Sequence, residues 1–147
     1  MERTFVMLKP GVIQRRIAGE ILQRLERKGA KIIALKMLRL DNATVEAHYA
    51  EHLGKNFYEN LVEYTLSGPV IAMVLEGPGV ISITRRLAGA TNAGESLPGT
   101  IRGDFAGTTK LNIIHTSDSP ESAAREIPLF FTEKDICNWD DGNGRWF

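Results

Sequence analysis

Apolar residues follow one another along this chain in two ways, as short unbroken runs and as runs with helical spacing. Unbroken runs bounded by proline, glycine or polar residues predict buried strands at residues 4–8, 31–40, 70–75 and 111–115. Spacing of three to four predicts helices at residues 17–28, 56–66 and 80–87. Ser119, followed by Pro120 and Glu121, predicts the start of another helix.

Local end signals support several of these elements. Gly29 follows the first helix as its expected C-terminal cap. Asp41 or Asn42 is expected to cap a short helix that runs through Tyr49 and His52. Gly19, inside the first helix, should cost about 1 kcal/mol relative to alanine, so we expect a close backbone approach there.

The order of these elements reduces to βαββαβ. This order is that of a ferredoxin-like fold, so we expect an α+β protein whose four-stranded antiparallel sheet is covered by helices. No repeat or linker divides the chain, and residues 1–147 should form a single domain.

Two further segments stand out. Residues 90–110 contain five glycines or prolines and no regular pattern, and connections this long tend to be functional. The polar tail from residue 138 carries Trp139, Trp146 and Phe147, which we expect to dock on the body or on a neighbouring subunit.

Composition excludes several classes of protein. The chain has 18 basic and 18 acidic residues, and this balance disfavours binding of nucleic acid by bulk charge. No apolar run is long enough for a bilayer span or a secretory signal. The single cysteine, Cys137, expected to be half-buried, cannot form an internal disulfide, which favours a reducing, cytoplasmic location.

The candidate chemistry centres on His115, which ends the fourth predicted strand. Asn112, Thr116, Ser117 and Asp118 surround it in sequence, and a neutral imidazole with such partners suits a nucleophile or a general base. For a lone histidine, the simpler interpretation is structural: its ring is hydrogen-bonded at the end of the strand and has no catalytic role.

Three basic residues favour the functional interpretation of His115. Lys9, Arg85 and Arg102 come from separate parts of the chain, each at the end of an element or in a loop. Three cations converging on one histidine would bind a polyphosphate and neutralise charge on a transferring group. We therefore expect phosphoryl transfer.

At this point the chain resembles a known family, the nucleoside diphosphate kinases, over essentially its whole length. The run Asn-Ile-Ile-His-Thr-Ser-Asp-Ser at 112–119 is similar to the family's active-site signature. The runs Pro-Gly-Thr-Ile-Arg-Gly-Asp-Phe at 98–105 and Ser-Gly-Pro-Val at 67–70 match as well.

The resemblance implies a function and a set of roles. His115 would take the γ-phosphoryl group of a nucleoside triphosphate and pass it to a nucleoside diphosphate in a ping-pong cycle. Glu126, with Ser117 between, would orient the imidazole. The positions that match phosphate and sugar contacts are Lys9, Tyr49, Arg85, Thr91, Arg102 and Asn112. Phe57, at a predicted helix start, would stack on the base, a contact that every base can make.

The resemblance also implies partners. Magnesium would be held mainly by the nucleotide phosphates and water, without a protein metal site. Homo-hexamers or homo-tetramers are expected, with the tail joining the interface, and neither a membrane nor a specific nucleic acid is an expected partner.

Four positions depart from the family pattern. Gly11 replaces Asp or Asn, and Thr116 replaces a small Gly or Ala next to the nucleophile. Thr109 stands where an aliphatic residue usually covers the base, and Ala93 replaces a proline often found in the long loop. Thr116 most favours the alternative function, a catalytically weak nucleotide-binding regulatory module on the same fold.

Overall fold

The computed structural model describes residues 1–147 and contains one antiparallel sheet. Its strands are β1 (Glu2–Leu8), β2 (Lys31–Leu38), β3 (Val70–Gly77) and β4 (Ile114–Thr116), in the spatial order β2-β3-β1-β4. Every neighbouring pair is antiparallel. The α+β class and the four-stranded ferredoxin-like arrangement predicted from the sequence are confirmed.

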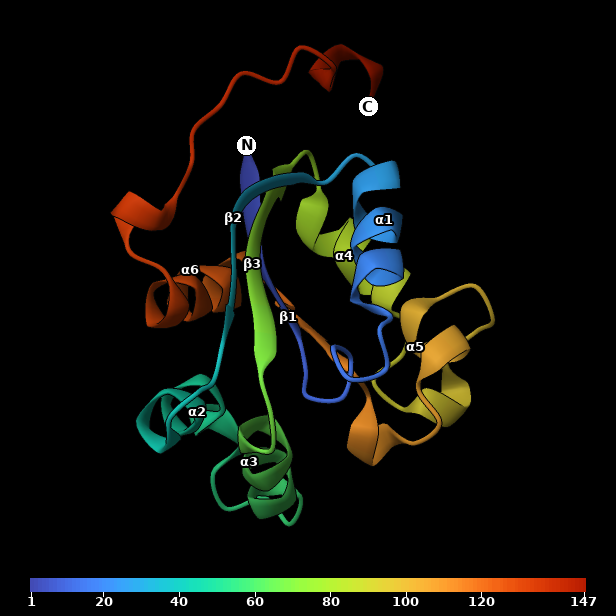
Figure 1. Ribbon diagram of the computed structural model, residues 1–147, viewed down its shortest axis with the longest axis vertical. Coiled ribbons are helices and arrows are strands. Elements are labelled where there is room, and N and C mark those ends of the chain that lie inside the picture. The colour runs from blue at the N-terminus through green and yellow to red at the C-terminus, as the bar shows by residue number, and fades with distance from the viewer.

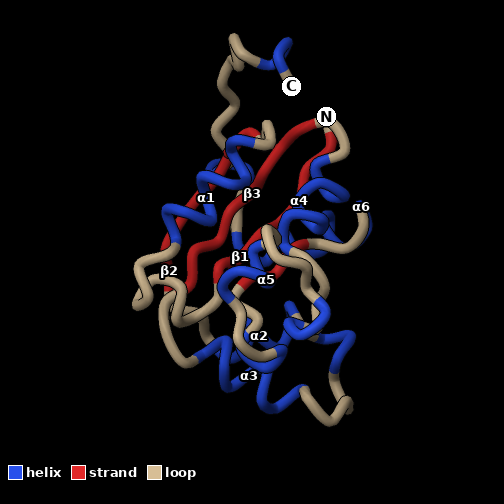
Figure 2. The backbone as a smooth tube through the Cα atoms, turned by 90° about the vertical axis from the view of Figure 1, so that its right-hand side faces the viewer, coloured by secondary structure: helices blue, strands red, loops and turns tan.

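Helices cover both faces of this sheet (Figure 1). One face packs against α1 (Ala18–Arg27), α4 (Val80–Ala88) and α5 (Ile101–Phe105). The other packs against α2 (Asn42–His48), α3 (Tyr58–Leu66) and α6 (Pro120–Phe130). Figure 2 looks onto the α1 and α4 side, with the sheet behind these helices.

The doubly covered sheet explains why its central strands are apolar at consecutive positions. In β1, Phe5 and Met7 belong to the core cluster beneath α2, α3 and α6, whereas Val6 and Leu8 belong to the cluster beneath α1 and α4. Successive side chains of a strand point to opposite faces, so a strand buried on both sides shows no polar alternation.

The predicted caps are present. Asp41 accepts a 2.8 Å hydrogen bond from the backbone N–H of Thr44, and Ser119 accepts one of 3.1 Å from Ser122. Gly29, just beyond α1, has a φ of 93°, a left-handed conformation that glycine adopts without strain.

The segment 90–110 differs most from expectation, because it contains regular structure. It holds the 3₁₀ turn η2 (Ala93–Glu95) and the helix α5, which Thr100 caps, and a second 3₁₀ turn, η3 (Thr109–Leu111), begins at its end. The fourth strand therefore begins at Ile114 and not at residue 111. Ile113, with a φ of 61°, breaks the extended backbone just before it.

Two smaller expectations were wrong. Gly19 is exposed, and a Cβ placed there would meet no atom within 4 Å, so no close approach explains this glycine. Cys137 is exposed and not half-buried.

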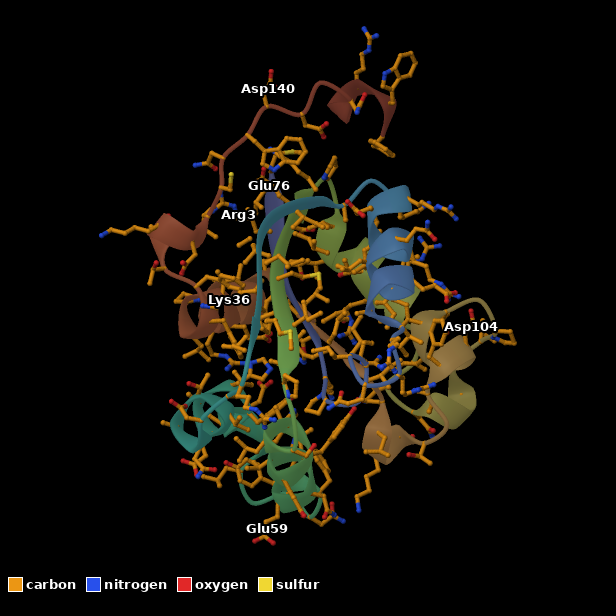
Figure 3. The ribbon with its side chains drawn as sticks, viewed as in Figure 1. Arg3, Lys36, Glu59, Glu76, Asp104 and Asp140 are labelled. Carbon is orange, nitrogen blue, oxygen red and sulfur yellow. The ribbon has the colours of Figure 1, made fainter.

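The tail returns to the body along β2. Trp139 Nε1 donates a 2.9 Å hydrogen bond to the carbonyl oxygen of Ile32, and Lys31 Nζ donates one of 2.7 Å to the carbonyl oxygen of Trp139. At the same end of the sheet Arg3 and Glu76 lie beside each other on β1 and β3, joined at 3.0 Å (Figure 3). At least one tail aromatic thus docks on the body.

None of the helices has the length and apolar character that a membrane crossing requires.

Candidate active site

One cavity of about 580 Å³ collects most of the residues singled out from the sequence. Their elements are far apart in the chain, and they meet where β1 and β4 end beside α4, α5 and the α2–α3 hairpin. The singled-out residues that line it are Lys9, Tyr49, Phe57, Arg85, Thr91, Arg102, Asn112, His115 and Glu126. Ser117 does not line the cavity, because it is fully buried behind it.

His115 and Glu126 form the tightest contact between two side chains in the cavity. The Nε2 atom of His115 on β4 lies 2.6 Å from Oε2 of Glu126 on α6. The Oγ of Ser117 donates to the same carboxylate oxygen at 3.2 Å. We had expected Ser117 to lie between Glu126 and the imidazole. Instead, Glu126 contacts the imidazole directly, and Ser117 lies beside the carboxylate.

The surroundings keep the His115 imidazole neutral. Burial lowers its pKa well below the usual range, and the positive charges of Lys9 and Arg102 lower the pKa further. Only 21% of the His115 side chain is exposed, and that part faces the cavity. A neutral imidazole retains the lone pair that a nucleophile needs.

Arg102 on α5 is held by backbone carbonyl groups alone. Its guanidinium donates to the carbonyl oxygens of Gly89 at 2.9 Å, Ile114 at 2.6 Å and Asn112 at 3.3 Å. Burial, followed by repulsion from Arg85, lowers the pKa of Arg102 to about 10, so it stays charged at neutral pH. Its orientation is fixed before any ligand arrives.

Lys9 follows the last residue of β1. Its Nζ donates a 2.7 Å hydrogen bond to Oδ1 of Asn112, and the residue is only 5% exposed. Lys9, Arg85 and Arg102 form no ion pair with a carboxylate. No carboxylate neutralises these three side chains by direct contact, which favours binding of an anion in the cavity.

The other end of the cavity offers an aromatic wall. Phe57 caps the start of α3 and is 46% exposed, so it is not part of the core stripe that Tyr64 joins. His52 approaches its ring edge-on, with centroids 5.3 Å apart. A planar apolar ligand can therefore stack at this end while its charged part reaches the cations.

His48 was not among the residues singled out from the sequence. It is 2% exposed, its ring lies edge-on to His115 with centroids 4.5 Å apart, and neither ring nitrogen has a hydrogen-bond partner. Ligand atoms of His48, His115 and Glu126 lie within 4.8 Å of one another. The charges of Lys9 and Arg102 oppose a metal ion there. The position of His48 just before Tyr49 was its one available signal.

Thr116 lines the same cavity as the nucleophile, but the strand register directs its side chain to the other face of the sheet. Thr116 pairs with Val6 and His115 with Met7, and these two partners belong to opposite core clusters. Because adjacent strand residues point to opposite faces, the threonine side chain lies on the α4 side and the imidazole on the α2 side.

Comparisons with known proteins agree with this geometry. The sequence pattern of the family described as "Nucleoside diphosphate kinase" matches residues 2–136. The chain is 55% identical over 146 residues to a nucleoside diphosphate kinase of Treponema pallidum, covering 99% of this chain and 98% of that one. A relative of the same name from Archaeoglobus fulgidus is 54% identical over 146 residues, with 99% and 97% covered.

Solved structures show the same relationship. A halophilic nucleoside diphosphate kinase from Halobacterium salinarum, in complex with CDP, superposes with a TM-score of 0.96 at 45% identity, covering 99% of this chain and 97% of that one. A family protein from Babesia bovis gives 0.95 at 46% identity, with 99% of both chains covered. The chain belongs to the nucleoside diphosphate kinase family.

Proposed function

We propose that this kinase carries the transferred phosphoryl group on Nδ1 of His115. The observation that carries this proposal is the 2.6 Å contact between Nε2 and Glu126. A carboxylate accepts hydrogen bonds, so Nε2 bears the ring proton and the lone pair resides on Nδ1. Nδ1 attacks the γ-phosphorus of a nucleoside triphosphate, the bond to the bridging oxygen breaks, and the nucleoside diphosphate leaves.

The second half-reaction reverses these roles. A terminal phosphate oxygen of another nucleoside diphosphate attacks the phosphorus, and the nitrogen–phosphorus bond breaks. Because the imidazole ends neutral with its proton still on Nε2, Glu126 holds the same tautomer throughout. Ser117 acts through Glu126 by fixing that carboxylate.

The phosphate ligands are Lys9, Arg85 and Arg102, with Tyr49, Thr91 and Asn112 completing the phosphate and sugar contacts. Burial raises the pKa of Tyr49, so its hydroxyl stays protonated and retains a proton to donate at neutral pH. Donors fixed in advance are effective because they need no reorganisation as charge develops.

Phe57 is the base-stacking platform. Its exposed ring at the rim offers a face to any base and no hydrogen bond that would distinguish one base from another. Stacking of this kind tolerates different bases, which fits broad nucleotide use.

Magnesium would be held mainly by the nucleotide phosphates. The lining offers Asp118 and Glu51 as additional carboxylates, but no group of three oxygen ligands for a dedicated site. Mg²⁺ keeps several waters and binds phosphates readily, so Asp118 could hold it through water. The ion would supply neutralisation of charge on the phosphates.

The decisive experiment is labelling with γ-³²P ATP followed by acid and base treatment. Wild type should acquire an acid-labile, base-stable phosphate, and His115→Asn should acquire none. Absence of label on the wild type would favour the weak nucleotide-binding regulatory module. The placement of Thr116 on the strand face opposite His115 favours the kinase instead.

We also propose a homo-oligomer, a hexamer or a tetramer, in the cytoplasm. β2 is an edge strand whose Leu35 and Met37 are 47% and 61% exposed, and a second copy could cover them. The exposed free thiol of Cys137 suits a reducing compartment. Sedimentation of the wild type against Met37→Glu tests the assembly, since an unchanged mass would exclude this edge as the interface.

A further inference from the structure

Two loops that border the nucleotide cavity are tied together by a threonine side chain. The Oγ1 of Thr109, the first residue of η3, donates a 2.9 Å hydrogen bond to Oδ1 of Asn92. The same oxygen accepts a 3.0 Å hydrogen bond from the backbone N–H of Ala93. We call this group of Asn92, Ala93 and Thr109 the Thr109 clasp.

The clasp acts on the segment that carries Thr91. Asn92 Oδ1 also accepts from the N–H of Gly94 at 3.0 Å, so the residue held by Thr109 is the one that caps η2. The other direct tether between this loop and the far wall, from Asn112 Nδ2 to the Thr91 carbonyl oxygen, is 3.5 Å long. Two further bonds restrain the same loop, from Ser96 Oγ to the carbonyl oxygen of Ala90 at 2.7 Å and from Arg102 to that of Gly89 at 2.9 Å. The clasp is the shorter of the two tethers that join the Thr91 loop to residues 109–112.

The clasp also decides what Thr109 presents to a nucleotide. Thr109 and Thr91 both line the cavity. The Thr109 hydroxyl has one proton, which is donated to Asn92, and one of its lone pairs is taken by Ala93. Toward a base, Thr109 therefore offers its γ-methyl group and one remaining lone pair, but no donor. A threonine can thus serve as an apolar wall here only while its hydroxyl is engaged.

We infer that the Thr109 clasp is a positioning device of the nucleotide site, in which Ala93 and Thr109 depend on each other. A proline at position 93 would have no N–H, so Thr109 would lose its donor. A valine at position 109 would leave the N–H of Ala93, a residue only 9% exposed, without its acceptor. The two departures from the expected family pattern are therefore one coupled feature. This inference rests on the proposed nucleotide site.

The backbone permits a clean test of this coupling. Ala93 is the first residue of η2, where proline is well tolerated, and Asn92 before it is extended with a ψ of 113°. Ala93→Pro therefore removes the N–H with little other strain. Thr109→Val removes the hydroxyl at constant shape, and Thr109→Ser retains it as the matched control.

The measurements are the dissociation constant for ADP by calorimetry and the nucleotide KM and kcat by turnover. Thr109→Val should raise the dissociation constant and KM about two- to fivefold, with a smaller change in kcat, as expected for a hydrogen bond of partly exposed groups. Thr109→Ser should weaken binding less than Thr109→Val. In the Ala93→Pro background, the loss of ADP-binding free energy caused by Thr109→Val should be less than half of the loss that it causes in the wild type.

Equal binding by the serine and valine variants, or an effect of Thr109→Val that is the same in both backgrounds, would overturn the clasp. ADP binding requires no phosphoryl transfer. If the wild type turns over normally but the double-mutant cycle of Ala93→Pro and Thr109→Val shows no coupling in ADP binding, the clasp is wrong and the kinase mechanism stands. If wild type forms no phosphohistidine yet ADP binding shows the coupling, the mechanism fails and the clasp stands.

Discussion

Lys9 and Asn112 join the end of β1 to the segment before β4. The Nζ of Lys9 donates to Oδ1 of Asn112 at 2.7 Å, and the backbone N–H of Lys9 donates to the carbonyl oxygen of Ile113 at 2.9 Å. An amide oxygen orients the ammonium group without neutralising it. Burial, followed by repulsion from Arg102, lowers the pKa of Lys9 to about 7.

This pKa predicts that nucleotide binding is linked to proton uptake. Below pH 7 the free enzyme already carries the Lys9 charge. Above pH 7 it loses that proton, and a bound phosphate must recover it. Affinity for ADP should therefore fall by up to about tenfold per pH unit above pH 7. Calorimetry in buffers of different ionisation heat, from pH 6 to 9, measures both effects.

Lys9→Arg is the matched control for this prediction. Arginine keeps its charge over this range, so the pH dependence that remains in the variant belongs to the nucleotide phosphates. The same slope in the variant and in the wild type would show that Lys9 does not titrate near neutral pH.

Ser117→Ala should lower stability as well as activity. Ser117 is fully buried, and its Oγ accepts a 3.1 Å hydrogen bond from the backbone N–H of Phe5. Removing the hydroxyl leaves that N–H unsatisfied, at a cost of about 1–3 kcal/mol in the free energy of unfolding. Urea denaturation measures this loss. Ser82→Ala, on the exposed side of α4, should change it by less than about 0.5 kcal/mol.

Loss of stability in Ser117→Ala with an unchanged rate of His115 phosphorylation would separate the two roles of the serine. In that case Glu126 would not need the 3.2 Å contact from Ser117 to hold the imidazole.

Gly103→Ala should displace Arg102. A Cβ at position 103 would collide with the carbonyl oxygen of Leu97, which is backbone and cannot swing aside. The start of α5 must then move, and Arg102 would lose its fixed bonds to backbone carbonyl groups. We expect at least a tenfold loss of kcat/KM, about 1.4 kcal/mol or more.

Gly107→Ala is the control for Gly103→Ala, because a Cβ at position 107 would meet no atom within 4 Å. Comparable activity of the two alanine variants would mean that the Leu97 loop yields without moving Arg102.

The sheet was predictable because its strands are buried on both sides. Leu8, Met73 and Leu75 lie in one core cluster and Met7, Ala72 and Val74 in the other, so the runs lack polar interruptions. The helix α5 was not predictable from the same signal. It has five residues, two of them charged and one a glycine, and its stability comes from the Thr100 cap and from packing of Ile101.

The convergence of the candidate residues in one cavity was predictable where residue type and element end coincide. Lys9, Arg85 and Arg102 each stood at such a place, and the structure gathers them around His115. His48 was not predictable, because a histidine at the end of a short helix carries no sign of being buried. Its proximity to His115 arises from the packing of α2 against α6 and β1, which involves long-range contacts.

The buried His48 should make stability sensitive to mild acid. Burial, with a smaller contribution from His115, lowers its pKa far below the usual value of about 6.5 that it regains on unfolding. Above pH 6.5 the His48 ring is neutral in both the folded and the unfolded state, so His48 does not change the free energy of unfolding. Between pH 6.5 and 5.5 only the unfolded state takes up the proton, so the free energy of unfolding falls by up to about 1.4 kcal/mol per pH unit for this residue. His115 adds a change of the same sign. Urea denaturation of His48→Gln against the wild type isolates the His48 share: the variant should lose less stability over this interval, and parallel curves would mean that His48 is protonated in the folded protein.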